Sequence, residues 1–250
     1  MQVIENGKKV DFFSEKKRGR VLDIPAGFGR EAAHLGELGF ATILFDLFPR
    51  PSEKHPQVWV RGDATKNLPF ANDRFDYVLT QEGIEHFEDQ ALFLKECARV
   101  LKPRGTLVLT TPNITNIRSR VSYMLTCQRT PRRGLINEIQ TRRVGKATGW
   151  SYHGHAFLID YFRLRYLLRF AGFDKIQVFT DRYSPTSIAM AWLIPAMFIA
   201  SRISANISLK KFQRKYKDGA GEKLFDEITS HVFSKAVLFG KRMIIVAQKS

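Results

Sequence analysis

The stretch VLDIPAGFGR, residues 21–30, joins a short apolar run to two glycines one residue apart. The run ends in Asp23, and a carboxylate at the end of an otherwise apolar strand is costly to bury unless something polar receives it. A helical pattern, REAAHLGELG (30–39), follows at once. Strand, glycine turn and helix in this order predict an α/β unit, and Asp23 predicts a ligand or a hydrogen-bonding loop at the turn.

Length and composition favour a folded protein. The chain has 250 residues, of which 44% are hydrophobic, enough for a substantial core. We expect one domain over residues 1–250, with a basic insertion at 114–155 and an apolar and basic insertion at 182–240. Cys97 and Cys127 cannot form a disulfide framework and no basic-then-apolar leader opens the chain, so we expect a cytoplasmic protein.

Apolar runs and amphipathic stretches alternate along the chain, which indicates βαβ units. Helices are expected at 30–39, 89–101 and 159–173, each ending near a glycine or proline. The expected strands are 20–24, 41–46, 57–61, 75–80, 105–111, 174–181 and 242–248. Strands that alternate with helices predict a mostly parallel sheet covered on both faces.

The regular alternation stops after Asn113. Residues 114–155 read as an irregular basic loop with a helix at 116–126. Residues 103–159 contain nine Lys or Arg and one acid, Glu138, within a chain of net charge +16. This segment is suited to nucleic acid, a phospholipid surface or an anionic substrate, and also to a solvated loop without a specific partner.

The glycine turn predicts a nucleotide-type cofactor. Residues 27–32 fit the pattern G-x-G-x-x-G/A, and Asp46 follows Gly27 by nineteen residues at the end of the second strand. Asp23 disfavours a pyrophosphate, because like charges repel. It favours S-adenosylmethionine (SAM), which carries a sulfonium and an ammonium group. Asp23 is expected to serve the amino-acid end through the loop and water, and Asp46 to hold both ribose hydroxyls.

The sequence resembles the class I methyltransferases over residues 20–113, and more loosely over 153–181. VLDIPAGFGR is similar to their first motif and ILFDLF to their ribose-binding strand end. The resemblance implies a Rossmann-like fold, a mostly parallel seven-stranded sheet with an antiparallel last strand and helices on both faces. It also implies the cofactor residues, which are Asp23, Ala26, Gly27, Gly29, Asp46, Leu47, the adenine-flanking Asp63 and Ala64, and Gln81. Pro25 and Ala26 depart from the family, whose loop often has its first glycine there.

Two histidines are candidate catalytic residues. Methyl transfer to a hydroxyl needs a base; His86 follows the fourth strand, and His155 closes the basic insertion. Either could instead be satisfied by backbone hydrogen bonds, and our hypothesis is that His155 is the base. The segment Glu82–His86 is also similar to one proposed to hold magnesium in ubiquinone-biosynthesis O-methyltransferases. Because related enzymes not known to need metal share this spacing, we expect no metal.

The run IAMAWLIPAMFIA, residues 188–200, has thirteen residues without a polar side chain. A membrane span needs about twenty, so this run alone does not predict one. Trp192 lies within it, and the basic residues that follow are Arg202, Lys210, Lys211, Arg214, Lys215 and Lys217. This pattern fits an interfacial anchor on anionic lipid at the inner membrane face, and equally a buried helix or a dimer contact.

The expected function is SAM-dependent methylation of a small-molecule, glycan or lipid-linked acceptor, with O-methylation at a membrane surface favoured. The segment TPNITNIRSRVSYMLT resembles methyltransferases of bacterial surface-glycan and isoprenoid pathways. An RNA methyltransferase is an alternative supported by the net charge. A non-catalytic protein that keeps the cofactor fold and a dehydrogenase are further alternatives. The sequence does not identify the acceptor atom or the oligomeric state.

Overall fold

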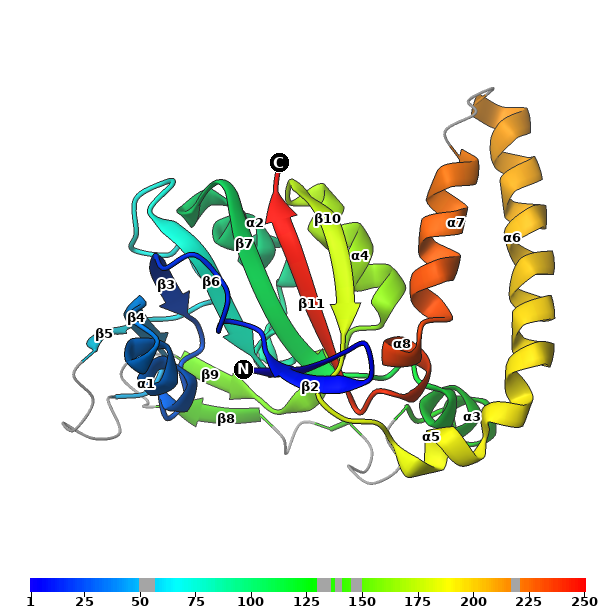
Figure 1. The fold of residues 1–250 in the computed structure, drawn as a ribbon, viewed down its shortest axis with the longest axis horizontal. Helices are drawn as coiled ribbons and strands as arrows, with labels where there is room; N and C mark the ends of the chain where they lie inside the picture. The colour runs from blue at the N-terminus through cyan, green and yellow to red at the C-terminus, as the bar shows by residue number, and fades with distance from the viewer. Residues whose placement is uncertain (50–56, 130–135, 138–140, 145–149, 217–220) are drawn as a thin grey trace.

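A seven-stranded sheet forms the centre of the protein (Figure 1). The computed structural model describes residues 1–49, 57–129, 136–137, 141–144, 150–216 and 221–250. The sheet strands are β3 (Arg20–Asp23), β4 (Ala41–Asp46), β5 (Val58–Arg61), β6 (Phe75–Gln81), β7 (Leu101–Pro112), β10 (Phe173–Phe179) and β11 (Arg242–Lys249). Their order is β10-β11-β7-β6-β3-β4-β5. In this sheet β11 runs opposite to the other six strands, which confirms the expected fold class.

The seven strands lie where the sequence predicts them, within a few residues at each end. The largest difference is the start of β7, at Leu101 instead of residue 105. Leu101 already pairs with Phe75, and the register then shifts before Tyr77 pairs with Thr106. The helix expected at 89–101 therefore ends at Val100.

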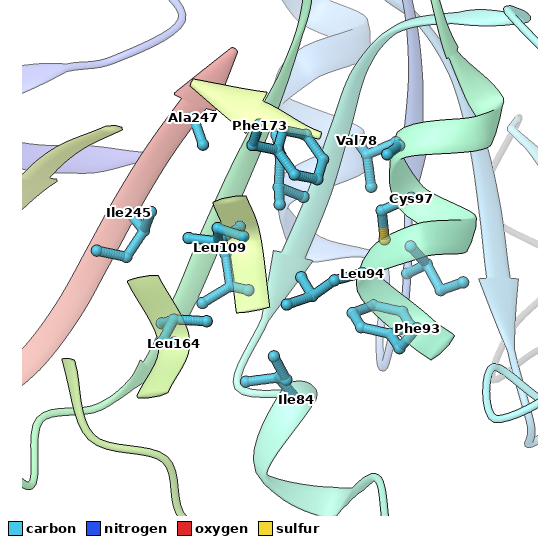
Figure 2. Close-up of a cluster of buried hydrophobic side chains, with 14 of the residues drawn as sticks. Val78, Ile84, Phe93, Leu94, Cys97, Leu109, Leu164, Phe173, Ile245 and Ala247 are labelled. Carbon is cyan, nitrogen blue, oxygen red and sulfur yellow. The ribbon is translucent and has the colours of Figure 1, made fainter. Parts of the chain in front are cut away.

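One face of the sheet is covered by α2 (Gln90–Val100) and α4 (Tyr161–Phe170). Figure 2 shows this core, where strand residues such as Val78, Leu109 and Ile245 meet Phe93 of α2 and Leu164 of α4. All five side chains are fully buried or nearly so. Burial of such side chains is worth roughly 1.5–3 kcal/mol each, so this layer holds the strands in register.

The opposite face is covered by α1 (Arg30–Glu37) and by a hairpin that the sequence analysis missed, β1 (Gln2–Glu5) with β2 (Lys8–Asp11). Leu79, Val108 and Ile244 point to this side, each the neighbour of a residue in the first core. Alternate strand residues thus supply the two cores, as the pleat requires. Helices therefore cover both faces, with the hairpin added to one.

Two long connections carry further elements. After β7 come α3 (Ile117–Thr126), close to its predicted position, and the hairpin of β8 (Thr141–Val144) and β9 (Trp150–His153). The expectation of an irregular loop was wrong for that hairpin; Arg132, Arg133 and Lys146 of the basic segment lie outside the described residues. After β10 come α5 (Pro185–Ala189), α6 (Ile194–Tyr216), α7 (Gly221–Val232) and α8 (Lys235–Phe239). Figure 1 shows α6 and α7 as a helical hairpin beside the sheet.

Candidate functional site

The glycine loop links the end of β3 to the start of α1. Gly27 and Gly29 have φ values of 55° and 67°, in the left-handed region that other residues enter at a cost. The N–H of Gly27 donates to Asp46 Oδ2 at 2.8 Å, which ties the loop to the end of β4. The space where a Gly27 side chain would project is open, with nothing within 4 Å. The backbone can therefore approach a ligand closely.

Gly27→Ala tests whether this open space belongs to the ligand. A left-handed alanine should lower the free energy of unfolding by about 1–2 kcal/mol, and its methyl group should weaken SAM binding further by occupying the ligand's place. Gly39→Ala is the matched control, because Gly39 has φ 85° and also nothing within 4 Å. We expect similar destabilisation in both variants by denaturant unfolding, and weaker SAM binding by calorimetry in Gly27→Ala alone. Equal SAM affinities in the two variants would contradict this assignment.

Asp46 connects the glycine loop to the end of β4. It is buried, and its second oxygen, Oδ1, accepts the N–H of Phe48 at 2.9 Å. Burial raises the pKa of Asp46, and the backbone donors partly offset this by favouring the charged form. Each carboxylate oxygen can accept more than one hydrogen bond, so the predicted ribose contact is compatible with the bonds already present.

Asp23 is the unusual charge of the site. Only 1% of its surface is exposed, and its Oδ1 has no hydrogen-bond partner among the described residues. Its pKa is raised well above the ordinary value, first by burial and then by the negative charges of Glu31 and Asp46. Three carboxylates around a glycine loop fit a cation and oppose a pyrophosphate. This residue set therefore fits the ammonium and sulfonium groups of SAM.

The remaining predicted cofactor residues follow the neighbouring strands. Asp63 lies after β5, where its Oδ1 accepts the N–H and the hydroxyl of Thr65, and Ala64 is buried beside it. The N–H of Gly62 donates to the Asp46 carbonyl at 2.9 Å, so the β4 and β5 ends are joined. Leu47, between them, accepts from Arg61 through its carbonyl.

Gln81 closes β6 and lines a polar cavity of about 250 Å³. Glu31 and Thr110 line the same cavity, together with the ion pair of Arg242 and Asp181, whose atoms are 2.5 Å apart. The sequence analysis missed this pair, because the two residues lie sixty-one positions apart and flank the second insertion. The cavity adjoins the first turn of α1, so a molecule there would lie beside the predicted cofactor loop.

The two candidate histidines lie together. His86 ends the 3₁₀ turn η1 (Ile84–His86), and His155 begins the turn η4 (His155–Phe157). Their ring centroids are 4.7 Å apart. Gln90 joins the turns by donating to the carbonyls of Ile84 and Phe157. The sequence separation of sixty-nine residues gives no hint of this pairing beyond the shared edge of the sheet.

The two histidines differ in their polar contacts. Nδ1 of His86 donates to the carbonyls of His153 and Gly154 at 2.6 and 3.0 Å. This is the alternative in which backbone hydrogen bonds satisfy the histidine. His155 Nδ1 lies 3.7 Å from Oε1 of Glu85, a fully buried residue. The other oxygen of Glu85 accepts the hydroxyl of Thr111 at 3.0 Å. This arrangement can stabilise a proton on His155.

A divalent cation is a second chemical possibility for this group. The ligand atoms of Glu85, His86 and His155 lie within 4.8 Å of one another, and such donors suit several divalent metals. The set differs from the sequence hypothesis, because Glu82 is not part of it and His155 is. Glu82 has a φ of 49° and its N–H bonds to Thr110.

The family model of a methyltransferase domain matches residues 4–178. Curated relatives include a demethylmenaquinone methyltransferase of Corynebacterium kroppenstedtii, 38% identical over 36% of this chain and 40% of the relative. A ubiquinone biosynthesis O-methyltransferase of Bradyrhizobium diazoefficiens is 36% identical over 38% of this chain and 40% of the relative. The chain thus spans less than half the length of the curated relatives it matches.

Solved structures share the fold. A SAM-dependent methyltransferase of Archaeoglobus fulgidus superposes with a TM-score of 0.51 at 19% identity, covering 94% of this chain and 87% of that one. Phosphoethanolamine N-methyltransferase 2 of Haemonchus contortus, solved with SAM bound, also gives 0.51 at 19% identity, over 95% and 50%. Both likenesses show the class I methyltransferase fold over nearly the whole chain. Because the family model matches well over half of its residues, the chain belongs to the methyltransferase-domain family.

Proposed function

We propose that the chain transfers the methyl group of SAM to a hydroxyl oxygen, with His155 as the general base. The observation that carries the proposal is the 3.7 Å approach of the His155 ring to the buried Glu85 carboxylate, at the same strand ends as the cofactor loop. A base is needed when the acceptor must lose a proton, as a hydroxyl does, and contributes typically ~10²–10⁴ in rate.

His155, Glu85 and His86 have different roles in the proposed mechanism. When bound, SAM supplies the methyl group, and its sulfonium becomes a neutral thioether as the carbon–sulfur bond breaks. A ring nitrogen of His155 takes the hydroxyl proton, and Glu85 stabilises the resulting imidazolium. His86 is a positioning residue, because its Nδ1–H holds the carbonyls of His153 and Gly154, immediately before His155. Alignment of the reacting groups supplies much of the remaining acceleration.

The acceptor is proposed to be a small molecule or a lipid-linked molecule. Two relatives are named for menaquinone and ubiquinone biosynthesis, which supports a small acceptor. The polar cavity beside Gln81, with Arg242 and Glu31 on its walls, offers hydrogen bonds to an acceptor of that kind. RNA remains the alternative acceptor, since the net charge of +16 suits it.

The direct experiment uses SAM labelled with ¹³C in its methyl group. The protein is incubated with a lipid extract, an aqueous metabolite extract and total RNA of the native cells, and the ¹³C shift of the transferred methyl distinguishes oxygen, nitrogen and carbon attachment. We expect an O-methyl signal in one of the first two fractions. Label attached to nitrogen or carbon, or found only in RNA, would contradict the proposal.

SAM binding should release protons through Asp23. Because the pKa of Asp23 is raised, this carboxyl group stays protonated in the free protein at pH values above its ordinary pKa. A bound cation favours the charged form of the group. SAM affinity should therefore rise as pH rises through that range. Calorimetry in buffers of different ionisation enthalpy measures the released proton. Asp23→Asn should remove both the release and the pH dependence; persistence of both in this variant would exclude Asp23 as their source.

Metal chelation separates the two chemistries open to Glu85, His86 and His155. In the proposed mechanism, the base works without a metal, so prolonged treatment with a chelator should leave the single-turnover rate unchanged. The control adds magnesium back to the treated protein. A rate that falls with chelation and returns with magnesium would reassign the three residues to a metal site and contradict the proton-transfer role of His155.

A further inference from the structure

The side of α6 that faces away from α7 carries exposed apolar residues. Trp192, just before the helix, is 75% exposed, and Ile199, Ile203 and Ile207 are each more than half exposed. Spacings of four residues place the three isoleucines on one side of α6, and Trp192 lies seven residues before Ile199, in the 3₁₀ turn that precedes the helix. The half-buried residues Met197, Ser201, Ala205 and Leu209 lie on the other side. We call the four exposed side chains the α6 stripe.

Further exposed apolar residues lie on the elements near the N-terminal end of α6. Ile188 of α5 is 50% exposed, and the end of α3 exposes Tyr123, Met124 and Leu125 by 50–75%. Helix α3 packs against α5, and α5 leads through Trp192 into α6. Figure 1 shows these elements together at the end of the sheet where β7 ends. Exposed apolar side chains gathered on neighbouring elements are typical of an interaction site.

The described part of the protein does not use this surface for its own folding. None of the α6 side chains that the structure describes is fully buried. Other residues of α6 make its contacts with α7 and the turn after it. Examples are the ion pair of Arg202 with Asp226 of α7 at 3.7 Å and the edge-to-face rings of Phe198 and Phe233, 5.0 Å apart. The stripe therefore remains available for a partner.

Charge indicates which partner. Lys210 and Lys211 are exposed at the far end of the stripe, and residues 191–217 contain no acid, while Arg214, Lys215 and Lys217 continue the basic sequence. Within the described part of the hairpin, the acids Glu222, Asp226 and Glu227 are on α7. A second copy of the chain on the α6 stripe would bring two sets of these basic residues together, which is unfavourable because like charges repel. We infer that the α6 stripe with Lys210 and Lys211 binds the surface of a membrane rich in anionic lipid.

The helix lies on the membrane and does not cross it. Among the described helices, Ala191–Lys211 alone is long and apolar enough to span a bilayer, with a mean hydropathy of 1.3 and none of it buried. The chain must return to β11 of the same sheet, and the helices on this return are α7, with 12 residues, and α8, with 5. Even end to end, these two helices would cover only about 26 Å, less than the hydrocarbon thickness of about 30 Å.

Vesicle flotation tests the inference, and it goes beyond the proposed function because methyl transfer plays no part in the measurement. The whole protein should float with phosphatidylcholine vesicles that contain phosphatidylglycerol, and much less with phosphatidylcholine alone. Ile199→Gln/Ile203→Gln should abolish flotation, whereas Ser204→Gln, an exposed change on the same helix, should not. Equal flotation of the double variant and the control would overturn the inference.

The lysines and Trp192 supply independent readouts. Lys210→Gln/Lys211→Gln should weaken binding roughly 30-fold, and Lys16→Gln/Lys17→Gln, which removes the same charge from another exposed lysine pair, should leave it nearly unchanged. The vesicles that contain phosphatidylglycerol should shift the tryptophan fluorescence emission of the wild-type protein to shorter wavelength, because Trp192 enters the lipid. They should not shift it in Trp192→Phe. A protein that ignores vesicles, and that Ile199→Gln/Ile203→Gln converts from dimer to monomer in sedimentation, would overturn the inference in favour of a second copy.

Discussion

Asp46→Ala is expected to weaken SAM binding about 100-fold. The change removes the charged acceptor of two backbone hydrogen bonds and also the predicted ribose contact. A hydrogen bond to a charged group is worth roughly 1.5–3 kcal/mol. The N–H groups of Gly27 and Phe48 both lose their acceptor. The glycine loop then loses its tie to β4, so the effect combines a lost contact with a loosened loop. Calorimetry with SAM measures the affinity.

Asp89→Ala is the matched control for this experiment. Asp89 also accepts a backbone N–H, that of Leu92 at 2.8 Å, but it caps α2 outside the site. Loss of a helix cap costs about 1 kcal/mol of stability, so the control should be destabilised without a change in SAM affinity. Affinities that fall equally in both variants would show that Asp46 acts through stability alone.

His155→Gln is expected to lower the single-turnover rate of methyl transfer by ~10²–10⁴, with SAM affinity nearly unchanged. Glutamine keeps a polar side chain of similar reach but cannot take a proton near neutral pH. The rate is measured with the acceptor fraction that the ¹³C experiment identifies. A binding role for His155 would change the affinity instead, so the two measurements together separate the alternatives.

Two further variants sharpen the test of His155. His34→Gln changes a partly exposed histidine of α1 that pairs with Asp11, and it should leave the rate unchanged. Glu85→Gln keeps the size of the buried side chain and should slow transfer less than His155→Gln, because Glu85 acts only through the imidazolium. If His155→Gln turns over at the wild-type rate, the proposed base is wrong.

Sequence pattern predicted the central sheet well because its signals are local. Short β-branched and aromatic runs between glycines, such as ATILFD at 41–46, became β4 with the same bounds. The first hairpin was missed even though a signal was present: Asn6 and Gly7 both have positive φ, as an Asn-Gly hairpin turn requires. Its strands carry few apolar residues, which hid the alternation.

The sequence predicts contacts of the candidate site only where they depend on chain order. The predicted cofactor residues follow strand ends, and parallel strands bring those ends to one edge, where the structure joins Gly27 to Asp46 by a hydrogen bond. The contacts of His155 with Glu85 and of Arg242 with Asp181 depend on how the insertions fold back. No periodic signal in the sequence encodes these approaches, which arise from tertiary packing.

A crystal structure with S-adenosylhomocysteine, the demethylated product, tests the central claim most directly. The account predicts that the ribose hydroxyls bind Asp46, that the amino end lies above the glycine loop near Asp23, and that the sulfur faces the His155–Glu85 pair. A sulfur atom that points away from His155, with the pair walled off from the cofactor, would contradict the account.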